Sequence, residues 1–266
     1  MLPNDTVILA REGAVARLTL NRPATLNTLD FPMVDALVAA SDALARDGAI
    51  RAVVLAGAGK HFMAGGDVRT FHSTLGRPPA ERHRVFEELV DRIHYAIETF
   101  HRLDVPVVAR VQGAVAGFGL SMVCACDLAI AAEDAYFAAA YRQIGLSPDG
   151  GMSWSLPRLV GARRAAEILL LSERFGAQEA RAMGLVNRVV PVAELDAAVD
   201  EVVGSLVAGP RGALRRSKRL LRQSWTSTLP EQLKAEAASF AACASGDEFT
   251  EGVSAFVDKR PARFGG

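Results

Sequence analysis

The sequence is poor in the features that mark several classes of protein. It holds three cysteines in 266 residues, and 30 Lys and Arg residues balance 30 Asp and Glu residues. A small, odd number of cysteines argues against a disulfide framework and favours a reducing compartment. A net charge of zero gives no reason to expect a nucleic acid or an anionic membrane as a partner.

Long apolar runs and metal-ligand spacing are also missing, and we expect no secretory signal. No apolar run reaches the roughly 18–20 residues that cross a bilayer. The first residues do not place a basic segment before an apolar one, as a secretory signal does. Cys124 and Cys126 are two positions apart on an expected helix, so they face different ways and do not make a metal pair. These observations predict a cytoplasmic protein without a metal site.

The residues that are present predict an α/β protein. Half of them are hydrophobic, which allows a sizeable core. Short apolar runs typical of strands alternate with stretches of helical periodicity up to about residue 190, and beyond Pro191 the pattern is helical only. We therefore expect a core over residues 1–194 and a helical C-terminal region over residues 195–266. The expected strands are 7–9, 15–20, 52–56, 107–111, 128–131, 136–138 and 186–190.

A glycine-punctuated segment follows the expected strand 107–111. Gly117 and Gly119 flank Phe118, and an apolar, almost uncharged run continues to Cys126. We interpret this run as a buried helix, whose first backbone N–H groups, around Phe118, are left open to a ligand by the glycines. The positive end of the helix dipole adds to these donors. Glycines before a helix also form ordinary turns, but the pattern indicates a place where an anion could be held.

A lone carboxylate, Asp149, comes later in a region otherwise poor in acidic residues. It lies in the sequence Ser-Pro-Asp-Gly-Gly at 147–151, and such a sequence is also a strong turn former. Together, a bare helix end and one isolated aspartate suggest enolate chemistry, in which an oxyanion must be stabilised while a base moves a proton.

A glycine-rich loop at 57–67 does not have the spacing of a nucleotide-binding loop. Gly57 and Gly59 begin a dinucleotide fingerprint, but Phe62 occupies the third glycine position and no helix is expected to open there. No Gly-Lys-Ser/Thr sequence follows either, so the loop is not a phosphate-binding P-loop.

Other titratable residues gather on two expected helices. On the first, at 81–103, we interpret the histidines as surface or packing residues and the carboxylates as solvated, although a carboxylate facing inward would be a second acid. These residues are His83, His94, His101, Glu87, Glu88 and Asp91. A basic cluster on a later helix is interpreted as a solvated face in preference to a phosphate or RNA patch. It consists of Arg211, Arg215, Arg216, Lys218, Arg219 and Arg222.

An ordered set of motifs resembles the crotonase superfamily, the enoyl-CoA hydratases and isomerases, over most of the chain. The segment 144–151 is also similar to that of the ring-1,2-epoxyphenylacetyl-CoA isomerases. The motifs are Leu20-Asn21-Arg22-Pro23 with Asn27, Phe62 to Asp67, Gln112-Gly113 through Gly117-Phe118-Gly119 to Ala131, Gly145 to Gly151, Leu156 to Gly161, Ala180 with Gly184-Leu185-Val186, and Phe256 with Lys259-Arg260-Pro261.

The resemblance implies a fold, a substrate and a set of site residues. The fold would be a spiral of strand–strand–helix units with a helical C-terminal part that builds homotrimers, usually paired into hexamers. The substrate would be an acyl-CoA thioester, with no cofactor beyond the CoA of the substrate. The backbone N–H groups of Gly66 and Phe118 would form an oxyanion hole. Further substrate contacts would come from Ala64, Gly65, Asp67, Ser121, Tyr141 and Lys259.

The chain departs from the hydratases where they carry two glutamates. Ser121 and Tyr141 stand at these positions, and neither can act as a carboxylate base. Asp149 lies where some isomerases of the superfamily place an aspartate, and apolar neighbours would raise its pKa by desolvation. We therefore expect an enoyl-CoA isomerase with Asp149 as base. The alternatives are a hydratase with an unrecognised second acid, for instance from 81–103, and a weakly catalytic CoA- or RNA-binding relative.

Overall fold

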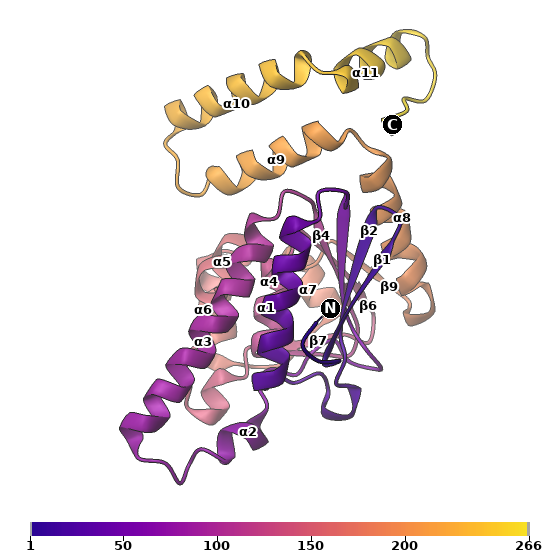
Figure 1. Ribbon diagram of the computed structural model, residues 1–266. Helices are drawn as coiled ribbons and strands as arrows, with labels where there is room; N and C mark the ends of the chain where they lie inside the picture. Colours follow the sequence, from indigo (N-terminus) through magenta and orange to yellow (C-terminus); the bar gives the residue numbers. More distant parts are fainter. Residues whose placement is uncertain (1, 265–266) are drawn as a thin grey trace.

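The computed structural model describes residues 2–264, and a six-stranded sheet organises its core (Figure 1). Its order is β1-β2-β3-β4-β6-β9; β1 and β2 form the expected antiparallel hairpin, and the other pairs are parallel. A smaller sheet has the order β5-β7-β8. The strands are Val7–Glu12 (β1), Val15–Leu20 (β2), Ala52–Gly57 (β3), Val107–Val111 (β4), Ala114–Ala116 (β5), Leu128–Ala132 (β6), Tyr136–Ala138 (β7), Phe175–Gly176 (β8) and Arg188–Val190 (β9).

Helices cover both faces of the larger sheet, and the last three lie beyond one end of it (Figure 1). In the described part of the chain, no helix is long and apolar enough to cross a membrane. The helices are Phe31–Arg46 (α1), Val68–His72 (α2), Pro79–Arg102 (α3), Phe118–Ala125 (α4), Met152–Val160 (α5), Ala162–Leu171 (α6), Ala177–Ala182 (α7), Leu195–Ala208 (α8), Arg211–Gln223 (α9), Leu229–Ala244 (α10) and Asp247–Val257 (α11).

Strand β3 shows why the central strands read as continuous apolar runs. Val53 and Leu55 point into the main core, whereas Ala52 and Val54 point to the opposite face. On that second face α8 packs against β3, β4 and β6. Since alternate side chains of a strand face opposite ways, a strand covered on both faces needs an apolar residue at every position.

The expected α/β class is confirmed, and most expected elements are present. The sequence pattern does not predict α2, β5 or β8, which have only five, three and two residues. These short elements depend on contacts with other parts of the chain. β5 is a strand because it pairs with β7, and α2 begins where the Asp67 side chain accepts hydrogen bonds from the N–H groups of Arg69 and Thr70.

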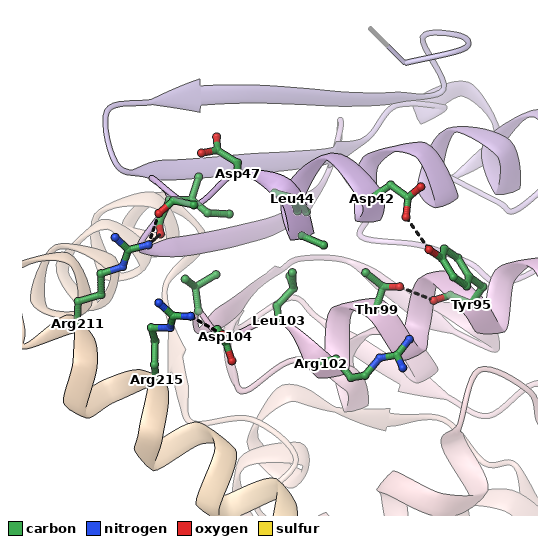
Figure 2. Close-up of a pocket in the computed structure, with 14 residues that line it drawn as sticks. Asp42, Leu44, Asp47, Tyr95, Thr99, Arg102, Leu103, Asp104, Arg211 and Arg215 are labelled. Carbon is green, nitrogen blue, oxygen red and sulfur yellow. Dashed lines mark hydrogen bonds and ion pairs between the residues drawn. The ribbon is translucent and has the colours of Figure 1, made fainter. Parts of the chain in front are cut away.

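The basic cluster on α9 fastens this helix to the core, so its interpretation as a solvated face is wrong. Lys218 is buried and donates to the Asp127 carboxylate, with Nζ and Oδ2 2.5 Å apart. Arg215 pairs with Asp104 at a cleft of about 490 Å³ that α9 forms with the ends of α1 and α3, and Arg211 also lines it (Figure 2). The basic residues that could have formed an RNA-binding patch therefore serve to attach α9 to the core.

Candidate active site

A mostly apolar cavity of about 470 Å³ lies between α3 and the loops that follow β3, β5 and β7. Side chains of α2 and α3, including Phe71, Phe86, Leu89 and Ile93, supply much of its apolar wall. Asp149 is the only carboxylate among the described residues that line it. Most ligand pockets combine an apolar wall with a few polar groups in this way.

The backbone N–H groups of Gly66 and Phe118, both in the cavity wall, have no acceptor among the described residues. Phe118 is the first residue of α4, so its N–H precedes the hydrogen-bond ladder of the helix, which starts with Leu120 and Ser121 donating to Gly117. Gly66 lies between two residues whose backbone is engaged, since Gly65 accepts from Leu29 and Asp67 donates to Leu29. Gly66 and Phe118 are the residues expected to form an oxyanion hole.

Glycines let the loops that carry these two donors touch. A Cβ atom on Gly119 would lie 2.2 Å from the carbonyl oxygen of Met63, which is closer than real Cβ atoms come to such an atom. Gly65 has a φ of +90°, and a Cβ there would lie 3.2 Å from the carbonyl oxygen of Ala116. The glycines therefore serve a close backbone approach that brings α4 against the loop after β3.

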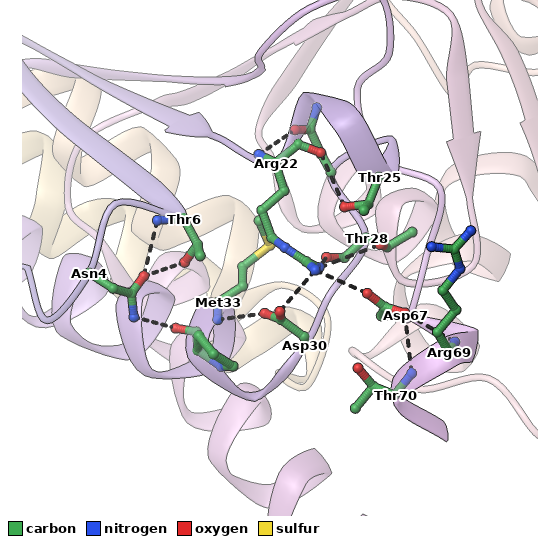
Figure 3. Close-up of polar contacts among 12 residues, drawn as sticks. Asn4, Thr6, Arg22, Thr25, Thr28, Asp30, Met33, Asp67, Arg69 and Thr70 are labelled. Carbon is green, nitrogen blue, oxygen red and sulfur yellow. Dashed lines mark hydrogen bonds and ion pairs between the residues drawn. The ribbon is translucent and has the colours of Figure 1, made fainter. Parts of the chain in front are cut away.

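Asp67 anchors the C-terminal end of the loop after β3 through polar contacts (Figure 3). Besides capping α2, its carboxylate pairs with Arg22 at 3.0 Å, and Arg22 also reaches Asp30 at 3.0 Å. Burial opposes the ionisation of Asp67, but the hydrogen bonds from Arg22 and the backbone of Thr70 outweigh it, so its pKa lies below the usual range. Asp67 fixes the position of the peptide that follows Gly66 and does not line the cavity.

Asp149 is held by Ser121 and Tyr141, the residues at the two positions where we expect a hydratase to carry glutamates. Tyr141 donates its phenol to Asp149, with Oη and Oδ1 2.5 Å apart. Ser121, on α4, donates to the carbonyl oxygen of Asp149 at 2.8 Å and lies 3.1 Å from the Tyr141 hydroxyl. Burial raises the pKa of Asp149, although the hydrogen bond from Tyr141 lowers it in part. Burial also raises the pKa of Tyr141, which keeps this donor protonated.

His94, on α3, lines the cavity, which its interpretation as a surface or packing residue does not anticipate. Its Nε2 accepts a hydrogen bond from the Gly150 N–H at 3.0 Å. Helical spacing could have predicted that His94 points inward, because position 94 is four residues after Val90 and lies on the apolar face of α3. His83 is exposed, and His101 packs against Trp154 and Trp225, as expected of surface and packing residues.

The structure brings together most of the expected site residues. Ala64, Gly65, Gly66, Phe118, Tyr141 and Asp149 all line the one cavity, and Ser121 is buried directly behind it. Lys259 follows α11, is exposed and does not line this cavity, so its contact with CoA stays a prediction. The carboxylates of α3 that could have turned inward are exposed, as expected. They are Glu87, Glu88 and Asp91.

Known proteins resemble this chain over nearly its whole length. A family model described as enoyl-CoA hydratase/isomerase matches residues 10–266. A Rhodobacter capsulatus protein named "Probable enoyl-CoA hydratase" is 36% identical over 252 residues, 95% of each chain. The 1,2-epoxyphenylacetyl-CoA isomerase of Escherichia coli is 32% identical over 255 residues, 96% of each chain. The crystal structure of a Polaromonas enoyl-CoA hydratase matches with a TM-score of 0.90 at 33% identity, over 97% of this chain and 98% of that one.

Proposed function

Because the chain belongs to the enoyl-CoA hydratase/isomerase family, we propose that it shifts a double bond within an acyl-CoA thioester, with Asp149 as the base. The observation that carries this proposal is Asp149, the single carboxylate in the cavity wall within residues 2–264. One base is enough to take a proton from one carbon and return it to another, whereas hydration also requires water to be activated.

The reaction would run through an enolate. The Asp149 carboxylate takes a proton from the α carbon of a β,γ-enoyl thioester, and the electrons of the broken C–H bond move toward the thioester oxygen. The N–H groups of Gly66 and Phe118 donate to this oxyanion, and each such donor is worth about 2.7–4 kcal/mol of barrier. The Asp149 carboxylic acid then gives its proton to the γ carbon, and the double bond is left between the α and β carbons.

Two thioesters test this proposal. With a β,γ-enoyl-CoA we expect the absorbance of the conjugated thioester to appear, and in deuterated water we expect any label that enters to be at the α or γ carbon. If the protein leaves the β,γ-enoyl-CoA unchanged but consumes an α,β-enoyl-CoA in water, the isomerase assignment is wrong.

Hydration is the second candidate, and His94 is the observation that favours it. It adds an imidazole to the wall that holds Asp149 and Tyr141, and it comes from α3, the helix that would supply the second acid of a hydratase. The hydratase name of the R. capsulatus relative is consistent with this candidate. In this case the conjugated absorbance of an α,β-enoyl-CoA would fall as a 3-hydroxyacyl-CoA forms.

Tyr141→Phe should move the acid limb of the pH–rate profile to higher pH. The hydrogen bond from Tyr141 lowers the pKa of Asp149, so its loss raises this pKa, and the base is then ionised only at higher pH. Below the limb we expect kcat/KM to fall about tenfold or more, since hydrogen bonds to charged groups contribute about 1.5–3 kcal/mol. At pH values above the acid limb, where Asp149 is ionised in both proteins, the loss in kcat/KM should be smaller. A profile that moves to lower pH would contradict this account of the Asp149 environment.

We also propose that copies of this chain assemble through the C-terminal helices. α10 has no buried residue, and the large apolar side chains of Phe240 and Phe256 are 75% and 86% exposed. A monomer rarely leaves so much apolar surface in water. The mass in solution, measured by light scattering, should be three or six times that of one chain. A monomer at micromolar concentration would contradict the proposal.

A further inference from the structure

We propose that His94 is a positioning residue, which together with Ser121 clamps the peptide group between Asp149 and Gly150 and so aims the Asp149 carboxylate. This inference rests on the proposed function for its catalytic readout. The clamp itself is a property of the fold, built from residues of two helices, α3 and α4.

Both polar atoms of one peptide group are held. Ser121 donates to the carbonyl oxygen of Asp149 at 2.8 Å, and the N–H of Gly150 donates to Nε2 of His94 at 3.0 Å. That oxygen and that N–H belong to the same planar peptide unit. With both edges held, rotation of this plane is restricted, which steadies the backbone from which the Asp149 side chain leaves.

Within the turn, the same carbonyl oxygen of Asp149 also accepts from the Met152 N–H at 3.2 Å, whereas the Gly150 N–H has only His94 as its acceptor. Gly150 and Gly151 have φ values of +60° and +75°, which glycine adopts freely. A Cβ on Gly150 would lie 2.7 Å from Cβ of Ser121, so no side chain can stand there to lock the backbone. The clamp therefore adds to the rigidity of a turn that its two glycines loosen, and at the N–H edge His94 is the partner that provides it.

The hydrogen bond also decides which role His94 can have. A nitrogen that accepts from an N–H carries no proton, so the neutral ring of His94 has its proton on Nδ1. Nε2 cannot take a proton from water while it accepts from Gly150. In this arrangement His94 holds the base in place and is not itself a base.

Two substitutions at position 94 separate positioning from proton transfer. Gln places an oxygen close to where Nε2 lies, so His94→Gln can accept from Gly150, but its amide takes up no proton at ordinary pH. His94→Leu keeps the apolar contacts and removes the acceptor. We expect the Leu variant to lose about 10–100-fold in kcat with KM changed less than about threefold, since a displacement of about 1 Å can cost about 10²-fold. The Gln variant should recover most of this loss. His83→Gln, exposed on the same helix, is the matched control and should behave like the wild type.

A loss in the Gln variant as large as in the Leu variant would overturn the proposal, because the imidazole itself would then be reacting. Full activity of the Leu variant would overturn it too. Hydrogen exchange of the Gly150 amide gives a readout that does not depend on turnover: protection in the wild type and the Gln variant, with at least about tenfold faster exchange in the Leu variant. If the wild type catalyses no isomerisation, the proposed function fails, and the exchange rates still test the clamp. Unprotected Gly150 in the wild type would refute it.

Discussion

Asp149→Asn is expected to lower the rate of the double-bond shift by at least about 10²–10⁴-fold, the contribution of a positioned base. The amide has nearly the shape of the carboxylate and can still accept the Tyr141 hydroxyl through Oδ1, so the cavity should keep its form. Affinity for the CoA thioester should change little. Single-turnover rates and equilibrium binding of an unreactive acyl-CoA measure the two effects separately, and retained turnover would refute the role of Asp149.

The same substitution should leave the fold at least as stable as the wild type near neutral pH. Burial raises the pKa of Asp149 in the folded protein above its value in the unfolded chain. The free energy of unfolding is therefore greatest at a pH below the pKa of the unfolded chain, and it falls as the pH rises through the pKa of the folded protein. Asn carries no charge, so the variant does not lose stability in this way as the pH rises. We expect the unfolding midpoint of the variant to match or exceed that of the wild type at pH 7, with less advantage at pH 4. A lower midpoint at pH 7 would mean that the carboxylate stabilises the fold.

Gly119→Ala is expected to lower kcat by about 10²–10³-fold, the cost of losing one oxyanion donor. The added methyl group would meet the carbonyl oxygen of Met63 at 2.2 Å, and backbone atoms cannot swing aside as a flexible side chain can. α4 must then move away from the loop after β3, and the Phe118 and Gly66 donors separate. The loss should appear in kcat more than in KM, because the oxyanion forms only after binding.

Gly204→Ala is the control for that substitution. Gly204 lies in α8, and a Cβ there would meet nothing within 4 Å. Alanine should stabilise the helix by about 0.5–1 kcal/mol and leave kcat unchanged. A Gly119→Ala variant that keeps its activity would show that the oxyanion is not held between these two loops.

Local patterns predicted the parts of the site that depend on local chemistry. An apolar run preceded by glycines identified α4 and its free N–H at Phe118, because helix ends and glycine conformations are set by neighbouring residues. The turn sequence located Asp149. The strands of the main sheet were also predictable, since both of their faces are buried.

Contacts between distant segments could not be read from those patterns. His94 meets Gly150 only because α3 packs beside the turn, 56 positions further along the chain. In the sequence Lys218 is one cation of a basic run, and only the packing of α9 brings it to Asp127, 91 positions away. In both cases the partner is chosen by tertiary packing, which overrides the general expectation for a histidine or a lysine on a helix.

The contacts of Asp149 with Ser121 and Tyr141 set a limit on how this site could change. A glutamate at position 121 or 141 would bring a second negative charge beside Asp149 in a space with little water, and two carboxylates so placed resist ionising together. Two such carboxylates would share one proton, so only one of them could serve as a base at a given pH. Gaining a glutamate at either position would therefore change which carboxylate serves as the base.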